Sequence, residues 1–441
     1  MLQSLSNSMK IPELRNRILF TLGMILVFRI GTHIPTPGVD AKLLTQNLPS
    51  SELFSFLNMF SGGALRRFSV FALGIAPYIN ASIIMQLLVY VIPYFEHLAK
   101  EEGEEGRKLI SQYTRYGTVL IGALQALGIS FMLERYQVVP NPGLAFKLMA
   151  VITLTAGTAF IMWLGEQMTA RGIGNGISIL ITAGILAALP EAVVQQVALF
   201  TGDAHDVVKT IFLVIFAVAT IMAIVYVQDG VRKIPVQYAK RVVGRRVYGG
   251  QNTYIPLRVN QAGVIPVIFA SSILMFPSMV FNWIQSLESM QEAVKNPIVF
   301  WFLNIFNYNT ATYIIIYVAL IIFFTYFYTA ITFNVQDLAD NMKKYGGFIP
   351  GIRAGQKTVE FLERTVSRVT LAGGVFLAVV SVIPNFLISF MNVSFYFGGT
   401  ALLIVVGVAI DTISQIESHL ITGNYEGFLG RAGGKRIKGR S

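Results

Sequence analysis

The chain of 441 residues contains no cysteine, only four histidines and few charged residues. Without cysteine it can form no disulfide, use no thiol nucleophile and bind neither an iron–sulfur cluster nor cysteine-ligated zinc. No two of the histidines have the spacing of metal ligands. Charged residues make up 13% of the chain, whereas a soluble domain averages about 25%. We therefore expect no metal and no cofactor, in a protein that is not a soluble one.

Sequence motifs of common enzymes are missing as well. The chain has no phosphate-binding loop of nucleotide hydrolases, no serine elbow of esterases and no paired histidines of zinc proteases. Residues 172–176 are rich in glycine, but they lead into an apolar segment and follow no soluble strand, so they do not indicate a nucleotide site. The sequence predicts a protein that is not an enzyme and that takes its energy from a partner.

The chain is instead rich in long apolar runs. Residues 259–287, 296–336 and 369–410 contain no Asp, Glu, Lys or Arg, over 29, 41 and 42 residues. A helix needs about 20 predominantly apolar residues to cross a bilayer. The runs therefore predict an all-α protein that crosses the membrane many times.

The hydrophobicity pattern predicts ten spans, which places both termini on one side of the membrane. That side would carry 26 of the 34 Lys and Arg residues, and the other side 8. Because positively charged loops stay on the cytoplasmic side, we expect both termini to be cytoplasmic. The expected spans are 18–34, 69–93, 114–133, 147–168, 176–198, 208–228, 262–283, 311–333, 368–389 and 395–413.

A short apolar stretch lies between the first two spans. Residues 53–60 are apolar enough to enter the membrane but too short to cross it, and Ser61, Gly62 and Gly63 interrupt them before Phe68 begins the next span. The pattern predicts a re-entrant helix, which is tolerated at membrane depth only if it is buried in protein or lines a cavity. The alternative is an interfacial helix that lies flat on the outer surface.

Isoleucines and a few polar residues stand out within the spans. Ile75 and Ile79, and likewise Ile177 and Ile181, are four residues apart and so share a helix face. Such faces are ordinary packing surface, or, if they meet around an axis, an apolar constriction that blocks ions by dewetting. The clearest polar residues are Asn80, Gln86 and Gln125, with Asn260 at a span entrance; each forms either a static packing bond or a contact that opens.

Two long loops lie on the expected cytoplasmic side. Residues 229–258 contain seven basic residues and one acidic residue, with tyrosines between them, and residues 334–367 carry mixed charge and a glycine- and proline-rich turn. These loops are either topology signals with solvated faces or docking surfaces for RNA phosphates or an acidic protein. Their length favours docking.

Ordered motifs along nearly the whole chain resemble the SecY family of protein-conducting channels. The motifs lie at residues 60–65, 71–79, 102–107, 112–115, 172–178, 244–248, 262–266 and 347–353. The resemblance implies an inverted repeat of two five-helix halves around an hourglass pore. The N-terminal half would be residues 1–189, the hinge 190–207, the C-terminal half 208–413 and the basic cytoplasmic tail 414–441.

The resemblance also assigns functional residues. A pore ring would surround the constriction, and a plug at about residues 53–68 would close it. Polar residues and one phenylalanine would line a lateral gate, and arginines of the two cytoplasmic loops would dock partners. The implied residues are Ile75, Ile79, Ile177, Ile181, Ile268 and Ile404 for the ring; Phe60, Gly62, Gly63 and Arg67 for the plug; Asn80, Gln125, Asn260 and Phe276 for the gate; and Arg245, Arg246 and Arg353 for docking.

The function implied by the resemblance is translocation of unfolded secretory polypeptides across the plasma membrane, with lateral release of signal or transmembrane helices into lipid. The implied partners are the SecE and SecG subunits, the SecA ATPase, the ribosome, signal sequences and nascent polypeptides, membrane lipid, YidC and SecDF. The alternative is an ion-coupled secondary solute transporter. That alternative predicts ionisable residues inside the membrane, and the spans contain almost none.

Overall fold

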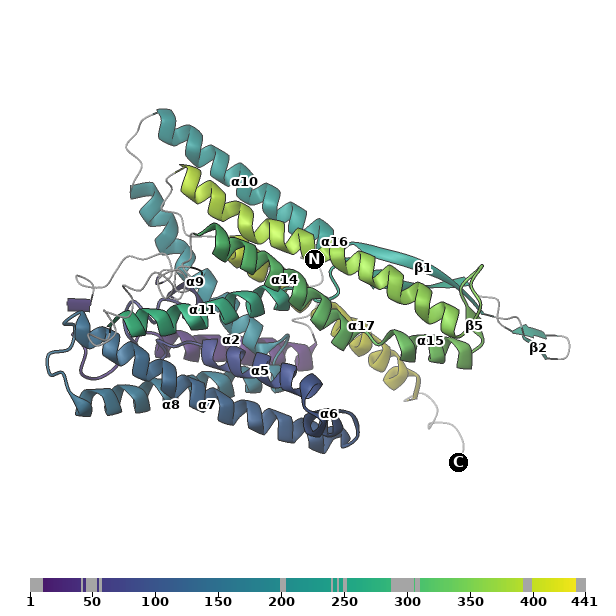
Figure 1. The fold of residues 1–441 in the computed structure, drawn as a ribbon. Coiled ribbons are helices and arrows are strands. Elements are labelled where there is room, and N and C mark those ends of the chain that lie inside the picture. Colours follow the sequence, from purple (N-terminus) through teal and green to yellow (C-terminus); the bar gives the residue numbers. More distant parts are fainter. Residues whose placement is uncertain are drawn as a thin grey trace. The chain divides into compact units, whose positions relative to one another are not determined.

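The structure is a computed structural model drawn in Figure 1. It describes residues 11–40, 43–44, 54, 58–198, 204–238, 241–243, 246–248, 252–286, 305, 310–391 and 399–433.

Two compact units make up the chain. The first contains Met1–Val197, Ser272–Tyr308 and Val408–Ser441, and the second contains Ala198–Ser271 and Asn309–Gly407. The long helices α11 (Ile265–Ser286) and α17 (Gly399–Gly433) contribute residues to both units.

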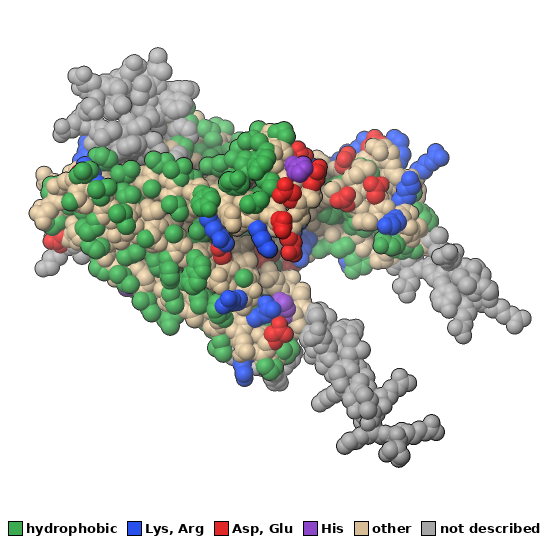
Figure 2. Space-filling view, turned by 90° about the horizontal axis from the view of Figure 1, so that it is seen from below, with side chains coloured by type: hydrophobic (Ala, Val, Ile, Leu, Met, Phe, Trp, Pro, Cys, Tyr) green, Lys and Arg blue, Asp and Glu red, His purple; other side chains and the backbone are tan. Residues whose placement is uncertain are grey.

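The first unit is built from α-helices. They are α2 (Pro12–Gly31), α5 (Ala76–Val91), α6 (Pro93–Lys100), α7 (Gly103–Arg135), α8 (Leu144–Arg171) and α9 (Gly176–Ala198), with the later parts of α11 and α17. Helices α7 and α8 form a hairpin whose outer faces are covered by hydrophobic side chains (Figure 2). Apolar side chains facing lipid are expected of a membrane protein, because the bilayer is an apolar solvent.

The second unit combines helices with small sheets. Its elements are α10 (Ala204–Gln228), β1 (Val231–Tyr238), β2 (Arg241–Val243), β3 (Arg246–Tyr248), β4 (Asn252–Arg258), α14 (Ala311–Thr332), α15 (Val335–Lys344), β5 (Gly347–Phe348) and α16 (Gln356–Met391), with the first parts of α11 and α17.

Each expected span overlaps one observed helix. Among the described helices, six are long and apolar enough to cross a membrane, and a seventh is added if α5 and α6 count as one span. The apolar helical segments Gly176–Pro190 of α9 and Ile265–Met275 of α11 are shorter. Several helices run beyond the expected spans, since α7, α16 and α17 continue into polar sequence. The chain is a polytopic, mostly helical membrane protein.

The second expected span is corrected at its start, because the structure begins the helix at Ala76 and not near Phe68. Phe68 has φ of 44° and Gly74 has φ of 57°, both in the left-handed region that an α-helix cannot use. Pro77 then lies in the first turn of α5, where its missing N–H costs nothing. Pro93 ends the span, and α6 departs from α5 at 97°.

The loop between α10 and α11 folds as a sheet that the sequence analysis did not predict. Strands β1 and β4 are antiparallel, with Val231 opposite Arg258, and β5 pairs with the end of β1. One face is apolar, as Ile234, Val236 and Leu257 pack with Met342 of α15 and Leu362 of α16. This apolar core gives the two long loops one ordered support.

One hydrophobic core of the first unit includes the segment before α5. Its members are Leu65, Phe68, Ala72 and Leu73 from that segment, Ala126, Ile129 and Leu133 of α7, and Phe146, Ala150 and Leu154 of α8, with Leu44, Val138 and Val139. The apolar side chains just before α5 are therefore buried in protein. Most of residues 53–60, where a re-entrant or an interfacial helix is expected, lies outside the described residues, so the choice between the two stays a prediction.

Candidate functional site

Residues 58–68, called here the plug segment, form a compact series of turns. The Gly62 and Gly63 amides donate to the carbonyl oxygens of Met59 and Asn58, at 3.1 and 2.8 Å. The Asn58 side chain accepts from the Arg66 amide at 2.8 Å. These local bonds satisfy the polar main chain that a non-helical segment would otherwise leave unpaired at membrane depth.

Two glycines give the plug segment its shape. Gly62 has φ of 69° and Gly63 has φ of 84°, a region that side chains other than glycine rarely adopt. A Cβ atom on Gly62 would lie 3.1 Å from the Cα atom of Gly184 in α9, whereas one on Gly63 would meet nothing within 4 Å. Gly62 is therefore required both for its conformation and for close approach to α9.

Helix α2 and the turn after it hold the plug segment. The Nη1 atom of Arg29 donates to the carbonyl oxygen of Gly62 at 2.9 Å. The Arg67 guanidinium contacts Nε2 of His33, and Nδ1 of His33 lies 2.8 Å from the carbonyl oxygen of Arg29. Because that carbonyl can only accept, Nδ1 carries the proton and Nε2 accepts from Arg67.

A small cavity separates the plug segment from α5 and α7. It has a volume of about 20 Å³, roughly that of a single water. Its walls include Ile75 and Ile79 as well as the plug residue Phe60, and its polar groups are Ser61, Gln125 and Ser272. The full lining is Phe60, Ser61, Leu65, Ala72, Leu73, Ile75, Ala76, Ile79, Gln125, Ile129, Ser272 and Met275. The structure thus brings two of the expected ring isoleucines against the plug.

The other expected ring residues lie on three helices. Ile177 is half-buried in the first turn of α9, and Ile181 one turn later is buried. Ile268 of α11 and Ile404 of α17 are also buried but belong to the second unit. In the first unit, Ile75 and Ile79 lie at the plug segment and Ile177 and Ile181 lie on α9. Closure of the ring by all six isoleucines stays a prediction.

Three of the expected gate residues are buried amides. Asn80 of α5 and Gln125 of α7 belong to the first unit, and Oε1 of Gln125 has no hydrogen-bond partner among the described residues. Asn260 of the second unit donates from Nδ2 to the carbonyl oxygen of Gly263 at 2.9 Å, and its Oδ1 is likewise unpaired in the described chain. The side chain of Phe276 lies outside the described residues.

Arg353 is the only expected docking residue whose side chain is described. It is exposed at a hollow of about 320 Å³ in the second unit, lined also by Lys357, Glu360 and Arg364. Lys357 is paired with Glu360 at 2.8 Å. Arg245 lies outside the described residues, and Arg246 begins β3 without a described side chain.

The sequence analysis missed two residues of this site, Arg29 and Gly184. In the sequence, Arg29 lies near the end of a span, where a long charged side chain can extend to the membrane surface. Its contact with the Gly62 carbonyl depends on the fold and is not visible in the sequence. Gly184 carries no sequence signal, since a glycine in an apolar helix has many roles. Among the described residues no three His, Asp or Glu side chains are grouped as a metal site.

The chain is similar to known proteins over nearly its whole length. A model of the SecY family matches residues 69–413. The protein translocase subunit SecY of Halalkalibacterium halodurans is 46% identical over 439 residues, which cover 97% of this chain and 100% of that protein. The subunit of the same name from Escherichia coli strain K12 is 46% identical over 430 residues, with 95% of each chain covered.

Solved structures share the fold at low sequence identity. A protein-conducting channel superposes with a TM-score of 0.64 at 17% identity, covering 95% of this chain and 97% of that one. The Sec61 channel of a canine ribosome–channel complex from the endoplasmic reticulum gives a TM-score of 0.60, again at 17% identity and with the same coverage.

Proposed function

This chain belongs to the SecY family, and from that premise we propose that its plug segment and six isoleucines seal the pore of a protein-conducting channel. The chain is a multi-pass membrane subunit of a protein translocase and not an enzyme. Its work is to provide a path and a gate for a polypeptide, and the solute-transporter alternative has no support.

The observation that carries the proposal is the shared cavity of plug and ring residues. Phe60, Ser61 and Leu65 of the plug segment line it together with Ile75 and Ile79. In the closed state the plug would exclude water from the side of the ring that it covers. An apolar ring then blocks hydrated ions while it offers no specific chemistry to a passing chain.

Opening requires few strong contacts to break. The described contacts that hold the plug segment include the hydrogen bond from Arg29, the Arg67–His33 contact, a 2.9 Å hydrogen bond from the Thr36 amide to the Phe68 carbonyl and apolar packing. Docking of a partner and insertion of a signal helix would shift a pre-existing equilibrium between closed and open states. We propose that Asn80, Gln125, Asn260 and Phe276 line the side opening through which apolar helices leave for lipid.

Ion conductance of the purified channel in planar bilayers tests the seal. Ile79→Gly and Ile181→Gly should raise the resting conductance, because each removes part of the constriction. Ile179→Gly is the matched control, since Ile179 is also buried in α9 but lies on a different face from Ile177 and Ile181. Unchanged conductance in both ring variants, or an equal rise in the control, would refute the ring.

Partners would bind through the cytoplasmic loops. The exposed Arg353 and the basic strands of the loop between α10 and α11 suit RNA phosphates of the ribosome or acidic surfaces of the SecA ATPase. YidC and SecDF would be further partners of the same channel.

Small membrane subunits would cover helix faces that this chain leaves open. In the membrane-crossing part of α10 only 11% of the residues are buried, against 28% or more in the other candidate spans. A helix of SecE packed there would bury this surface, with SecG at the periphery. Mild-detergent purification followed by mass spectrometry of small companion chains tests this, and recovery of the chain alone would contradict it.

The orientation follows from charge. The bias of Lys and Arg toward one set of loops supports a channel in the plasma membrane with both termini in the cytoplasm. Labelling of single introduced cysteines is simple in a chain that has none. A cysteine at Lys344 should react only from the cytoplasmic side, and one at Gln137 only from outside.

A further inference from the structure

The glycine-rich segment at residues 172–176 joins α8 to α9 and has no role in the seal described above. The Gly172 amide still bonds the Met168 carbonyl of α8, but the amides of Ile173, Gly174 and Gly176 donate to side chains. The Ile173 amide donates to Oγ1 of Thr21 in α2 at 3.1 Å, and the Gly174 amide donates to Oε1 of Gln415 in α17 at 2.9 Å. Three separate helices of the first unit thus meet at this segment.

The start of α9 is capped by side chains as well. The Gly176 amide donates to Oγ1 of Thr169 in α8 at 2.9 Å. Oδ1 of Asn175 accepts the amides of Ile177 and Ser178, at 3.1 and 3.3 Å. The first amides of a helix have no partner within it, so these acceptors fix where α9 begins.

Glycines bring the main chains of α8 and α9 into contact. A Cβ atom on Gly176 would lie 2.1 Å from the carbonyl oxygen of Gly165, so no side chain fits there. A Cβ atom on Gly165 would lie 3.0 Å from Cγ1 of Ile177. The side chain of the expected ring residue Ile177 therefore packs directly against α8 at Gly165.

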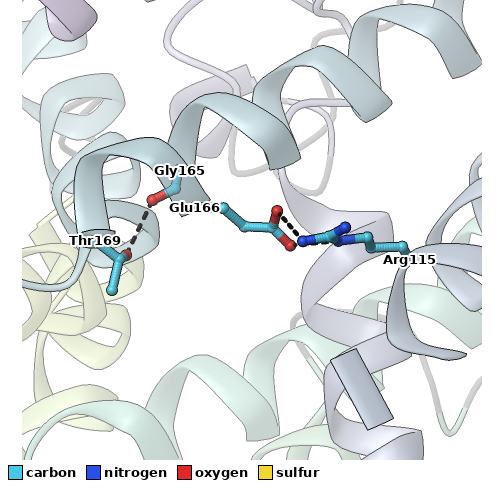
Figure 3. A network of polar contacts seen from close by, with 4 residues as sticks. All are labelled: Arg115, Gly165, Glu166 and Thr169. Atoms are coloured by element: carbon cyan, nitrogen blue, oxygen red, sulfur yellow. Dashed lines mark hydrogen bonds and ion pairs between the residues drawn. The ribbon is translucent and has the colours of Figure 1, made fainter. Parts of the chain in front are cut away.

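An ion pair on the same stretch of α8 fixes that helix to α7. Nε and Nη2 of Arg115 donate to the two carboxylate oxygens of Glu166, at 2.9 and 2.8 Å (Figure 3). Thr169, one turn further along α8, donates to the Gly165 carbonyl at 2.9 Å (Figure 3). The same hydroxyl accepts from the Gly176 amide. A two-point Arg–carboxylate pair sets orientation as well as distance.

We propose that Thr169 and Gln415 are positioning residues of the pore ring: by accepting the amides of Gly176 and Gly174, they hold the first turn of α9, and Ile177 with it, at a fixed place against α8. The inference rests on the proposed ring, in which Ile177 narrows the pore. Loss of either acceptor lets the first turn of α9 move and widens the constriction without altering a ring residue.

The test is resting ion conductance of the purified channel complex in planar bilayers. Thr169→Val keeps the shape but loses the acceptor, and should raise conductance severalfold. Thr169→Ser keeps the hydroxyl and should behave as the natural chain does. Thr118→Val is the matched control, because the hydroxyl of Thr118 in α7 bonds the Thr114 carbonyl one turn back and no other group among the described residues. It should leave conductance unchanged.

A double variant separates positioning from general loss of stability. In an Ile177→Ala background the conductance is already raised, so Thr169→Val should add little to it. An additive rise, or a rise equal to that of Thr118→Val, overturns the proposal. If the Thr169→Val protein does not accumulate in the membrane, the same comparison is made at Gln415. Gln415→Leu loses the acceptor and should raise conductance, whereas Gln415→Glu retains an acceptor and should not.

The outcome also distinguishes this inference from the proposed function. If Ile79→Gly and Ile181→Gly raise conductance while Thr169→Val and Gln415→Leu do not, the ring stands and the positioning role is wrong. If none of the four raises it, the ring itself is wrong.

Discussion

Nη1 of Arg29 donates a 2.9 Å hydrogen bond to the carbonyl oxygen of Gly62, so a cation in the first long helix holds the plug segment by its main chain. The acceptor does not depend on a side chain in the plug segment, and it belongs to Gly62, the glycine that closely approaches α9. A hydrogen bond to a charged group contributes roughly 1.5–3 kcal/mol. On the proposed gating, a contact of this strength would favour the closed state and still be weak enough to break.

Replacing Arg29 should loosen the plug. Arg29→Leu removes the donor and should raise the resting ion conductance, since a loss of about 1.4 kcal/mol shifts the closed–open ratio about tenfold. Arg29→Lys keeps a cationic donor and should retain part of the seal. The measurement is conductance in planar bilayers. If the resting conductance of Arg29→Leu equals that of the natural channel, the bond does not hold the plug.

The two plug glycines give a matched pair of substitutions. Gly62→Ala and Gly63→Ala both place alanine at positive φ, which costs about 1 kcal/mol. Gly62→Ala also pushes a methyl group against the main chain of Gly184, whereas Gly63→Ala meets open space. We expect the first to raise conductance and lower the melting temperature more than the second. Equal effects would mean that the approach to α9 is unimportant for the seal.

Gln125 offers a prediction of the opposite sign. Its Oε1 atom is buried without a partner in the described chain, and an unpaired buried polar atom costs roughly 1–3 kcal/mol. Gln125→Leu removes that cost and should stabilise the closed channel. Translocation of substrates with weakly apolar signal sequences should then slow, while strongly apolar signals are less affected. Faster translocation of the weak signals would contradict a gate role for this residue.

Much of the fold is predictable from the sequence because the bilayer imposes simple rules on it. Charge-free runs have to be helices, since lipid satisfies no main-chain polar group, and each expected span overlaps a helix. The start of the second span was wrong because hydrophobicity alone does not reveal main-chain turns. Residues 68–75 are as apolar as a span, but Phe68 and Gly74 at positive φ prevent a helix there.

Only those site residues that stand out as sequence patterns, or that the family resemblance implies, could be predicted from the sequence. The isoleucine pairs and the glycines of the plug segment show as patterns, and the structure places Ile75 and Ile79 beside the plug. Contacts such as Arg29 with Gly62, or Gly174 with Gln415, join residues far apart in the chain. No spacing rule reports them, since they depend on how helices pack.

The last prediction concerns the hollow at Arg353 and compares two charge reversals in it. Among the described residues no ion pair is formed by Arg353, whereas the Lys357 ammonium is bound to Glu360 at 2.8 Å. An incoming anionic partner therefore meets a free cation at Arg353 and a neutralised one at Lys357. Arg353→Glu should block ATP-driven translocation, and Lys357→Glu, with the same change in charge, should reduce it less.

The measurement is translocation into inverted membrane vesicles with the SecA motor and ATP, at channel levels matched by immunoblot. Equal levels in the membrane separate docking from insertion, because the side chains of Arg353 and Lys357 are both exposed. High salt should lower the translocation rate of the natural channel toward that of the Arg353→Glu variant. The reason is that salt screens the exposed charge, with a Debye length of about 10 Å at 0.1 M salt. Normal translocation by Arg353→Glu, or an equal loss in both variants, would show that the unpaired guanidinium does not recruit the motor.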